Sequence, residues 1–243
     1  MQEIILYGIC FFIVAFLYAS VGHGGASGYL ALMAVFGFSA AVMKPTALLL
    51  NVMVSLIAFI SFYKAKHFRH QLLWPLIVAS IPFAYLGSVI PVSDLLYKKI
   101  LGIVLLLSVI RLLLNSSNKA LKPAPKWYVL SIIGALIGLV SGMIGMGGGI
   151  LLSPILLLMC WSNQKQTAAI SAIFIFLNST AGIVGQLKTG FDLSPQILTI
   201  VGFVLVGGWL GAYIGAEKLR FKNMKFILAS VLVLAAAKLF FVK

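Results

Sequence analysis

The sequence predicts an all-α polytopic membrane protein made of two homologous repeats, and three observations lead to this fold class. Of the 243 residues, 62% are hydrophobic and only 9% are charged, whereas soluble domains carry about 25% charged residues. Long apolar runs alternate with short basic connections, which is the pattern of a multi-pass protein with positive loops on one side of the membrane. Glycine-rich breaks recur at corresponding places in the two halves.

We expect residues 1–114 to form the first repeat. A helix needs about 20 apolar residues, or somewhat fewer, to cross a bilayer. The run at 4–21 has no Lys or Arg before it and recurs in mid-chain, so we interpret it as a mature helix and not as a signal peptide. The apolar runs of this half predict a helical hairpin over 4–37 and three spans over 45–62, 72–91 and 98–114.

The second repeat is expected over residues 127–243. A polar linker with two prolines, 115–126, separates it from the first repeat, and its basic character predicts a cytoplasmic location. The apolar runs of the second half repeat the order of the first half. They predict a helical hairpin over 127–160 and three spans over 166–187, 194–216 and 226–242.

The two halves align along most of their length. Gly22-His23-Gly24-Gly25 pairs with Gly145-Met146-Gly147-Gly148 and, past a one-residue slip, Ser55 pairs with Ser179. Repeated halves are typical of secondary transporters. If each hairpin turns back to the side where it starts, the repeats are inverted. The positive-inside rule favours this arrangement over parallel repeats, because it gathers more Lys and Arg in the loops 63–71, 115–126, 161–165 and 217–225.

Each glycine-rich break offers the start of a helix to a ligand. The first turn of a helix presents amides without an intrahelical acceptor and about +0.5 elementary charge. Glycine has no Cβ, so an anion can approach these amides closely. Close helix packing also uses small residues, but it does not require runs of them at matched positions. We therefore predict a midplane anion site that includes Gly22, His23, Gly24, Gly25, Ala26, Ser27, Gly145, Met146, Gly147, Gly148 and Gly149.

The paired motifs GHGGASGYLALMAVFG and GMIGMGGGILLSPILLL resemble those of the TauE/SafE sulfite exporter family, and the resemblance covers essentially the whole chain. The second motif follows the family pattern, with Pro154 five residues after Gly149. The first motif departs from it, because Ala26 replaces a third glycine and Ala31 stands where the second motif has its proline. The resemblance implies transport of small sulfur-containing or organic anions across the cytoplasmic membrane.

Five uncharged polar residues inside the predicted spans add hydrogen-bond donors to this site. We expect them to contact the substrate, with hydrogen bonds between helices as the alternative. Asn51 and Ser55 lie one helical turn apart and share a face of their helix. The five residues are Asn51, Ser55, Asn178, Ser179 and Thr180. Other hydroxyl residues lie nearer the span ends, where we favour a packing role: Thr46, Thr167 and Ser171.

His23 is the ionisable residue placed directly in a break. An unperturbed histidine has a pKa of about 6.5, so its charge changes near neutral pH. It would bind an anion when protonated, or carry a coupling proton. We favour the alternative of a neutral, structural histidine, because Met146 takes the matching place. No Asp or Glu falls inside a predicted span, so a cation site is not expected.

These features predict a secondary transporter of the cell membrane that moves sulfite or a short organosulfonate. An anion channel, or a transporter of another small oxyanion or carboxylate, remains the alternative, and a homodimer is left open. An enzyme is not expected, because the three histidines, two cysteines and four acids are scattered. We expect no cofactor, no metal and no nucleic-acid partner, since the +14 net charge sits in loops between apolar runs.

Overall fold

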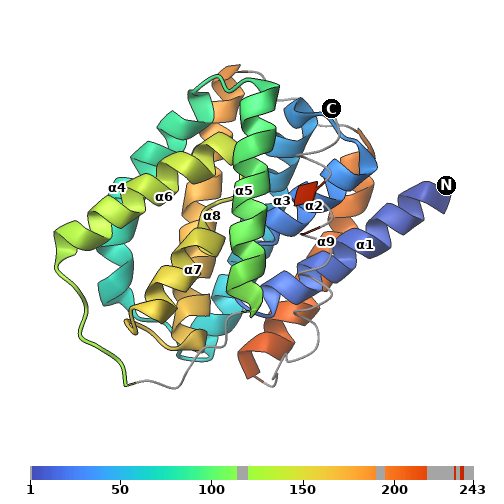
Figure 1. Cartoon of the computed structure of the whole chain (residues 1–243). Coiled ribbons are helices and arrows are strands. Elements are labelled where there is room, and N and C mark those ends of the chain that lie inside the picture. Colours follow the sequence, from blue (N-terminus) through green and yellow to red (C-terminus); the bar gives the residue numbers. More distant parts are fainter. Residues whose placement is uncertain (1, 114–119, 190–194, 218–232, 234–235, 238–243) are drawn as a thin grey trace.

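Helices make up the described part of the chain. The computed structural model describes residues 2–113, 120–189 and 195–217, with the isolated residues 233, 236 and 237. The predicted span 226–242 otherwise lies outside these residues. Within them, the elements are nine helices and no strand (Figure 1): α1 (Gln2–Ala19), α2 (Ala26–Phe36), α3 (Ala40–Lys64), α4 (His70–Val89), α5 (Asp94–Leu113), α6 (Trp127–Ile144), α7 (Gly149–Leu158), α8 (Gln164–Thr189) and α9 (Pro195–Glu217).

The predicted spans and the observed helices agree to within a few residues, with one larger difference at the start of α3. The apolar run begins at residue 45, but α3 already begins at Ala40. The helix includes Lys44, whose ammonium donates to the Ser88 carbonyl at the end of α4 over 3.0 Å. The apolar run that predicts this span begins only after Lys44, because that residue is charged. In the folded chain the Lys44 ammonium lies at the C-terminus of α4, where the helix dipole favours a cation.

Five of the described helices are long and apolar enough to cross a membrane: α3, α4, α6, α8 and α9. The two helices that follow the breaks are much shorter, with 11 residues in α2 and 10 in α7. At 1.5 Å per residue, each covers about 15 Å, or roughly half of the bilayer core. The breaks therefore lie well inside the protein and not at its ends.

Glycines bring the first helix of each half close to the fourth helix of the other half. α6 lies along α4, and α1 lies along α9 (Figure 1). A Cβ on any of the three glycines of α6, or on three of the glycines of α9, would meet a main-chain carbonyl of the facing segment. This is the close packing of small residues that holds helices together in membranes. The glycines at these contacts repeat every fourth residue, at Gly134, Gly138 and Gly142 on α6 and at Gly207, Gly211 and Gly215 on α9.

Both broken hairpins return to the end of the molecule at which they start. In the first half, the Tyr7 ring near the start of α1 lies 4.4 Å, centroid to centroid, from the Phe36 ring at the end of α2. In the second half, the Lys122 amide, which precedes α6, donates to the Cys160 carbonyl after α7 over 2.8 Å. α3 and α8 contact each other between the hairpins, α3 lying against α2 and α8 against α7.

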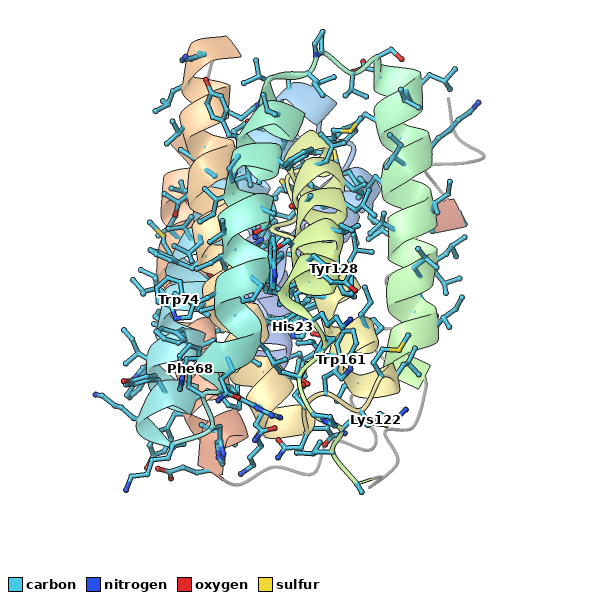
Figure 2. All side chains as sticks on the ribbon, turned by 90° about the vertical axis from the view of Figure 1, so that its left-hand side faces the viewer. His23, Phe68, Trp74, Lys122, Tyr128 and Trp161 are labelled. Carbon is cyan, nitrogen blue, oxygen red and sulfur yellow. The ribbon has the colours of Figure 1, made fainter. Side chains whose placement is uncertain are left out.

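Several connections gather at one end of the molecule. The Arg69 guanidinium, between α3 and α4, donates to the Trp161 carbonyl after α7 over 3.0 Å. The Lys165 ammonium at the start of α8 donates to the Ala216 carbonyl at the end of α9, also over 3.0 Å. Figure 2 shows Trp161 and Lys122 near this end, with His23 inside the helix bundle.

Candidate functional site

The two breaks have matching backbone conformations. Gly25 precedes α2 with φ 96°, and Gly148 precedes α7 with φ 79°, so both lie in the left-handed region that glycine adopts without strain. The preceding turns also match, since the His23 amide donates to the Tyr18 carbonyl over 2.9 Å and the Met146 amide donates to the Ser141 carbonyl over 3.1 Å. Each break thus ends one helix and starts another inside the protein, as the sequence predicts.

Asn51 connects the two breaks. Its side-chain oxygen accepts a hydrogen bond from the Ala26 amide, the first of α2, over 3.0 Å. Its side-chain nitrogen donates to the Met146 carbonyl in the second break over 3.0 Å and to the Ser179 hydroxyl on α8 over 3.3 Å. Asn51 is 1% exposed. A single neutral amide therefore links one helix start to the unwound backbone of the other half.

A small cavity lies between the breaks. Its volume open to a water-sized sphere is about 10 Å³, which is room for about one water molecule. The wall from the first half carries most of the polar groups, whereas the second half contributes apolar side chains. The lining residues are Tyr18, His23, Gly24, Gly25, Ala26, Ser27, Asn51, Met146, Ile150 and Ile175. None of these is acidic.

Predicted residues that do not line the cavity fall into two groups. Some lie directly behind it: Gly22, Gly145, Gly147, Gly148 and Gly149 are buried in the breaks, the Ser55 hydroxyl donates to the Asn51 carbonyl, and Ser179 accepts from Asn51. Two residues of α8 instead donate to carbonyls of their own helix. Asn178 donates to the Phe174 carbonyl over 2.9 Å, and the exposed Thr180 donates to the Phe176 carbonyl over 2.8 Å.

His23 contacts a hydroxyl of the second half that the sequence analysis did not include. Its Nε2 lies 2.9 Å from Ser153 Oγ on α7, which in turn lies 2.9 Å from Ser171 Oγ on α8. All three side chains are at most 1% exposed. The sequence interpretation assigned Ser171 to packing. The spacing of Ser153 from Gly149, one helical turn, was the available signal for a residue facing the break.

Tyr18 is a further lining residue that sequence reasoning missed. Its hydroxyl accepts a hydrogen bond from the Ser27 hydroxyl on α2 over 2.7 Å. Tyr18 lies in the last turn of α1, next to the break, and is 4% exposed. Among the described residues, no three His, Cys, Asp or Glu side chains come together as a metal site. What the described geometry offers is neutral hydrogen-bond donors and two helix starts around one cavity.

Comparison with known proteins agrees with the resemblance of the two motifs. The family described as "Sulfite exporter TauE/SafE" matches residues 7–239. The chain is 36% identical over 242 residues to "Probable membrane transporter protein y4hK" of Sinorhizobium fredii, covering 98% of both chains. It is 26% identical to "Probable membrane transporter protein YjnA" of Bacillus subtilis, again over 98% of both chains.

A plant relative is similar over a shorter stretch. "Sulfite exporter TauE/SafE family protein 3" of Arabidopsis thaliana is 27% identical over 110 residues, which cover 44% of this chain and 23% of the relative. No solved structure matches the chain at a significant level. The family match covers nearly the whole chain, and the y4hK protein matches it end to end. The chain, a multi-pass membrane protein, therefore belongs to the sulfite exporter TauE/SafE family.

Proposed function

We propose that this membrane transporter moves a small anion, sulfite or a short organosulfonate, through a midplane site between the two breaks. The observation that carries the proposal is the meeting of two helix starts, one from each half, at one cavity with Asn51 between them. The choice of a sulfur anion rests on the family, since a carboxylate or phosphate would use the same donors. Asn178 and Thr180 are the predicted contacts that this geometry supports least.

The electrostatics of the site favour an anion over a cation. The N-termini of α2 and α7 each contribute about +0.5 elementary charge at the same place, and the lining residues include no carboxylate. The hydrogen-bond donors of this site would be the main-chain amides of the breaks, since the Ser27 hydroxyl already donates to the Tyr18 hydroxyl. Buried in a medium of low dielectric, these partial charges act more strongly than they would in water.

The cavity volume has a consequence for the transport cycle. Room for about one water molecule is too little for a sulfur atom with three oxygens. The substrate therefore enters only when the walls of the cavity separate, which requires α2 or α7 to move relative to α3 and α8. Alternating access meets this requirement and so does the opening of a gated channel, and counterflow separates the two.

Alternating access needs one state open to each side of the membrane, and inverted repeats would supply these two states. The start of α1 and the end of α2 lie together at the end where α3 begins, and the ends of the α6–α7 hairpin lie where α3 finishes. This geometry supports hairpins that enter from opposite faces of the membrane. Each hairpin would then open the site to its own side while the other stays closed, as in transporters with broken helices.

Counterflow in proteoliposomes tests the function. Vesicles loaded with unlabelled sulfite should take up labelled sulfite, and sulfonates should compete at lower concentration than acetate, phosphate or chloride. Protein-free vesicles give the background. If a carboxylate competes at lower concentration than the sulfur anions, the anion site is retained and the substrate is a carboxylate. Competition only by cations would contradict the proposal, and a non-saturable flux without counterflow would assign a channel.

A further inference from the structure

We propose that His23 carries one proton together with each anion, so that a monovalent substrate crosses the membrane without net charge. Ser153 and Ser171 of the second half act as positioning residues for this proton site. The inference rests on the proposed transport of an anion through the cavity between the breaks. It adds a proton as the coupling ion. It also gives a role to Ser153 of α7 and Ser171 of α8, which the anion site itself does not require.

The imidazole of His23 is fixed at both ring nitrogens. Nδ1 lies 3.0 Å from the Val21 carbonyl, which is an acceptor, so this nitrogen carries a hydrogen in either charge state. Nε2 lies 2.9 Å from the Ser153 hydroxyl, which can donate or accept. The proton that comes and goes is therefore the one on Nε2. His23 also lines the cavity, so the charge of its imidazolium ring would lie beside the anion.

The Ser153 hydroxyl can serve both charge states by turning its hydrogen. When His23 is neutral, Ser153 donates to Nε2. When a proton from the aqueous phase binds Nε2, the imidazolium donates to Ser153 Oγ, and the Ser153 hydrogen turns to the Gly149 carbonyl, 2.9 Å away. Ser171 Oγ lies 2.9 Å from Ser153 Oγ and can donate to it in both states. Turning the Ser153 hydrogen needs no movement of a heavy atom in this trio. The proton itself enters and leaves Nε2 when the hairpins open the cavity to water on one side or the other.

His23 has little competition for this proton from its surroundings. On α1 and α2, the titratable side chains nearest the break are the phenols of Tyr18 and Tyr29, which are neutral at physiological pH. The sequence of α7 contains no titratable residue. The parts of α3 and α8 beside His23, from Asn51 to Ser55 and from Ser171 to Ser179, contain none either. Lys44 of α3 lies against Gly145 of the second break, and its ammonium donates to the Ser88 carbonyl.

Charge compensation explains why anion and proton would move as a pair. A buried, unpaired charge is strongly unfavourable in a protein interior. An anion in the cavity would stabilise the imidazolium, and the imidazolium would stabilise the anion, so each raises the affinity of the site for the other. The paired state is neutral as a whole, which favours the reorientation of the hairpins with both bound.

The test uses the full-length protein in proteoliposomes with methanesulfonate, which stays a monoanion at every pH used. Its steady-state accumulation is measured under a potential clamped with potassium and valinomycin, and separately under a pH gradient. Wild-type protein should accumulate methanesulfonate about tenfold per unit of pH gradient, and a 100 mV potential should leave that ratio unchanged. A uniported monoanion would instead change its ratio by about 50-fold per 100 mV, and this result would overturn the inference while leaving anion transport intact.

Variants test the residues. His23→Gln should lose the response to the pH gradient, and any remaining flux should follow the potential. Ser153→Ala should shift the pH midpoint of counterflow but keep it electroneutral. Ser61→Ala is the matched control, because its hydroxyl also donates to the carbonyl one turn earlier but lies in α3 away from His23; its midpoint should stay at the wild-type value. If Ser153→Ala keeps the pH midpoint of the wild type, Ser153 does not position the proton site. If wild-type protein does not transport methanesulfonate, both the inference and the sulfonate substrate are contradicted.

Discussion

The side-chain amide of Asn51 donates to the main-chain carbonyl of Met146 over 3.0 Å, so a residue of the first half holds the unwound backbone of the second. The same side chain accepts from the Ala26 amide. An asparagine can do both because it carries a donor and an acceptor without net charge. The two breaks are thus coupled through one side chain at the wall of the cavity.

Replacing Asn51 by leucine should impair transport and stability together. The change leaves the Ala26 amide and the Met146 carbonyl buried without this partner, and each such group costs about 1–3 kcal/mol. We expect a lower melting temperature in detergent and a loss of transport of roughly tenfold or more. Ser61→Ala on the same helix is the control and should retain both. A fully active Asn51→Leu protein would mean that the link between the breaks is dispensable.

Adding one methyl group to either break should be enough to disturb the site. A Cβ at Gly24 would overlap the side-chain oxygen of Asn51. A Cβ at Gly147 would lie 2.9 Å from the Asn51 nitrogen, and the left-handed φ of 67° adds a penalty of about 1–2 kcal/mol. Gly24→Ala and Gly147→Ala should therefore reduce counterflow strongly while folded protein remains in the membrane.

Gly202→Ala supplies the matched control for these glycine variants, because a Cβ at Gly202 meets nothing within 4 Å. Its counterflow should equal that of the wild type. If Gly24→Ala and Gly147→Ala also transport at wild-type rates, the breaks are packing features and the anion site lies elsewhere.

Glycine packing between the halves should be sensitive to larger side chains. A Cβ at Gly138 would overlap the Ser80 carbonyl of α4, and one at Gly211 would overlap the Phe16 carbonyl of α1. Leucine at either position must push the helices apart, since main-chain atoms cannot turn away. We expect melting temperatures well below that of Gly202→Leu, measured by fluorescence-detected size exclusion after heating. Equal stability of all three variants would show that the helices pack differently.

The membrane orientation can be tested at exposed positions. Lys122 and Glu217 lie with the connections that gather at one end, and Ser93 lies between α4 and α5 at the other. In a background with Cys10 and Cys160 replaced by alanine, cysteines at Lys122 and Glu217 should react with an impermeant thiol reagent only from the cytoplasm. A cysteine at Ser93 should react from outside. Opposite accessibility of Lys122 and Glu217 would exclude inverted repeats.

The sequence by itself determined which segments are helices and where they break. Apolar runs and glycine runs are local features, and the conformation they favour depends mainly on the residues themselves. This is why the breaks before Ala26 and Gly149 fall where the sequence predicts them. The inverted arrangement of the repeats stays a prediction, because hydropathy does not tell on which side a short hairpin ends.

Only the tertiary structure decided which side chains meet at the breaks. Ser179 and Thr180 are consecutive and equally polar, yet Ser179 is fully buried beside Asn51 and Thr180 is exposed. Helical periodicity says that neighbours point in different directions, but which direction faces the core depends on the helices packed around α8. The contact of His23 with Ser153 joins residues 130 positions apart, and such a contact exists only once the two hairpins lie against each other.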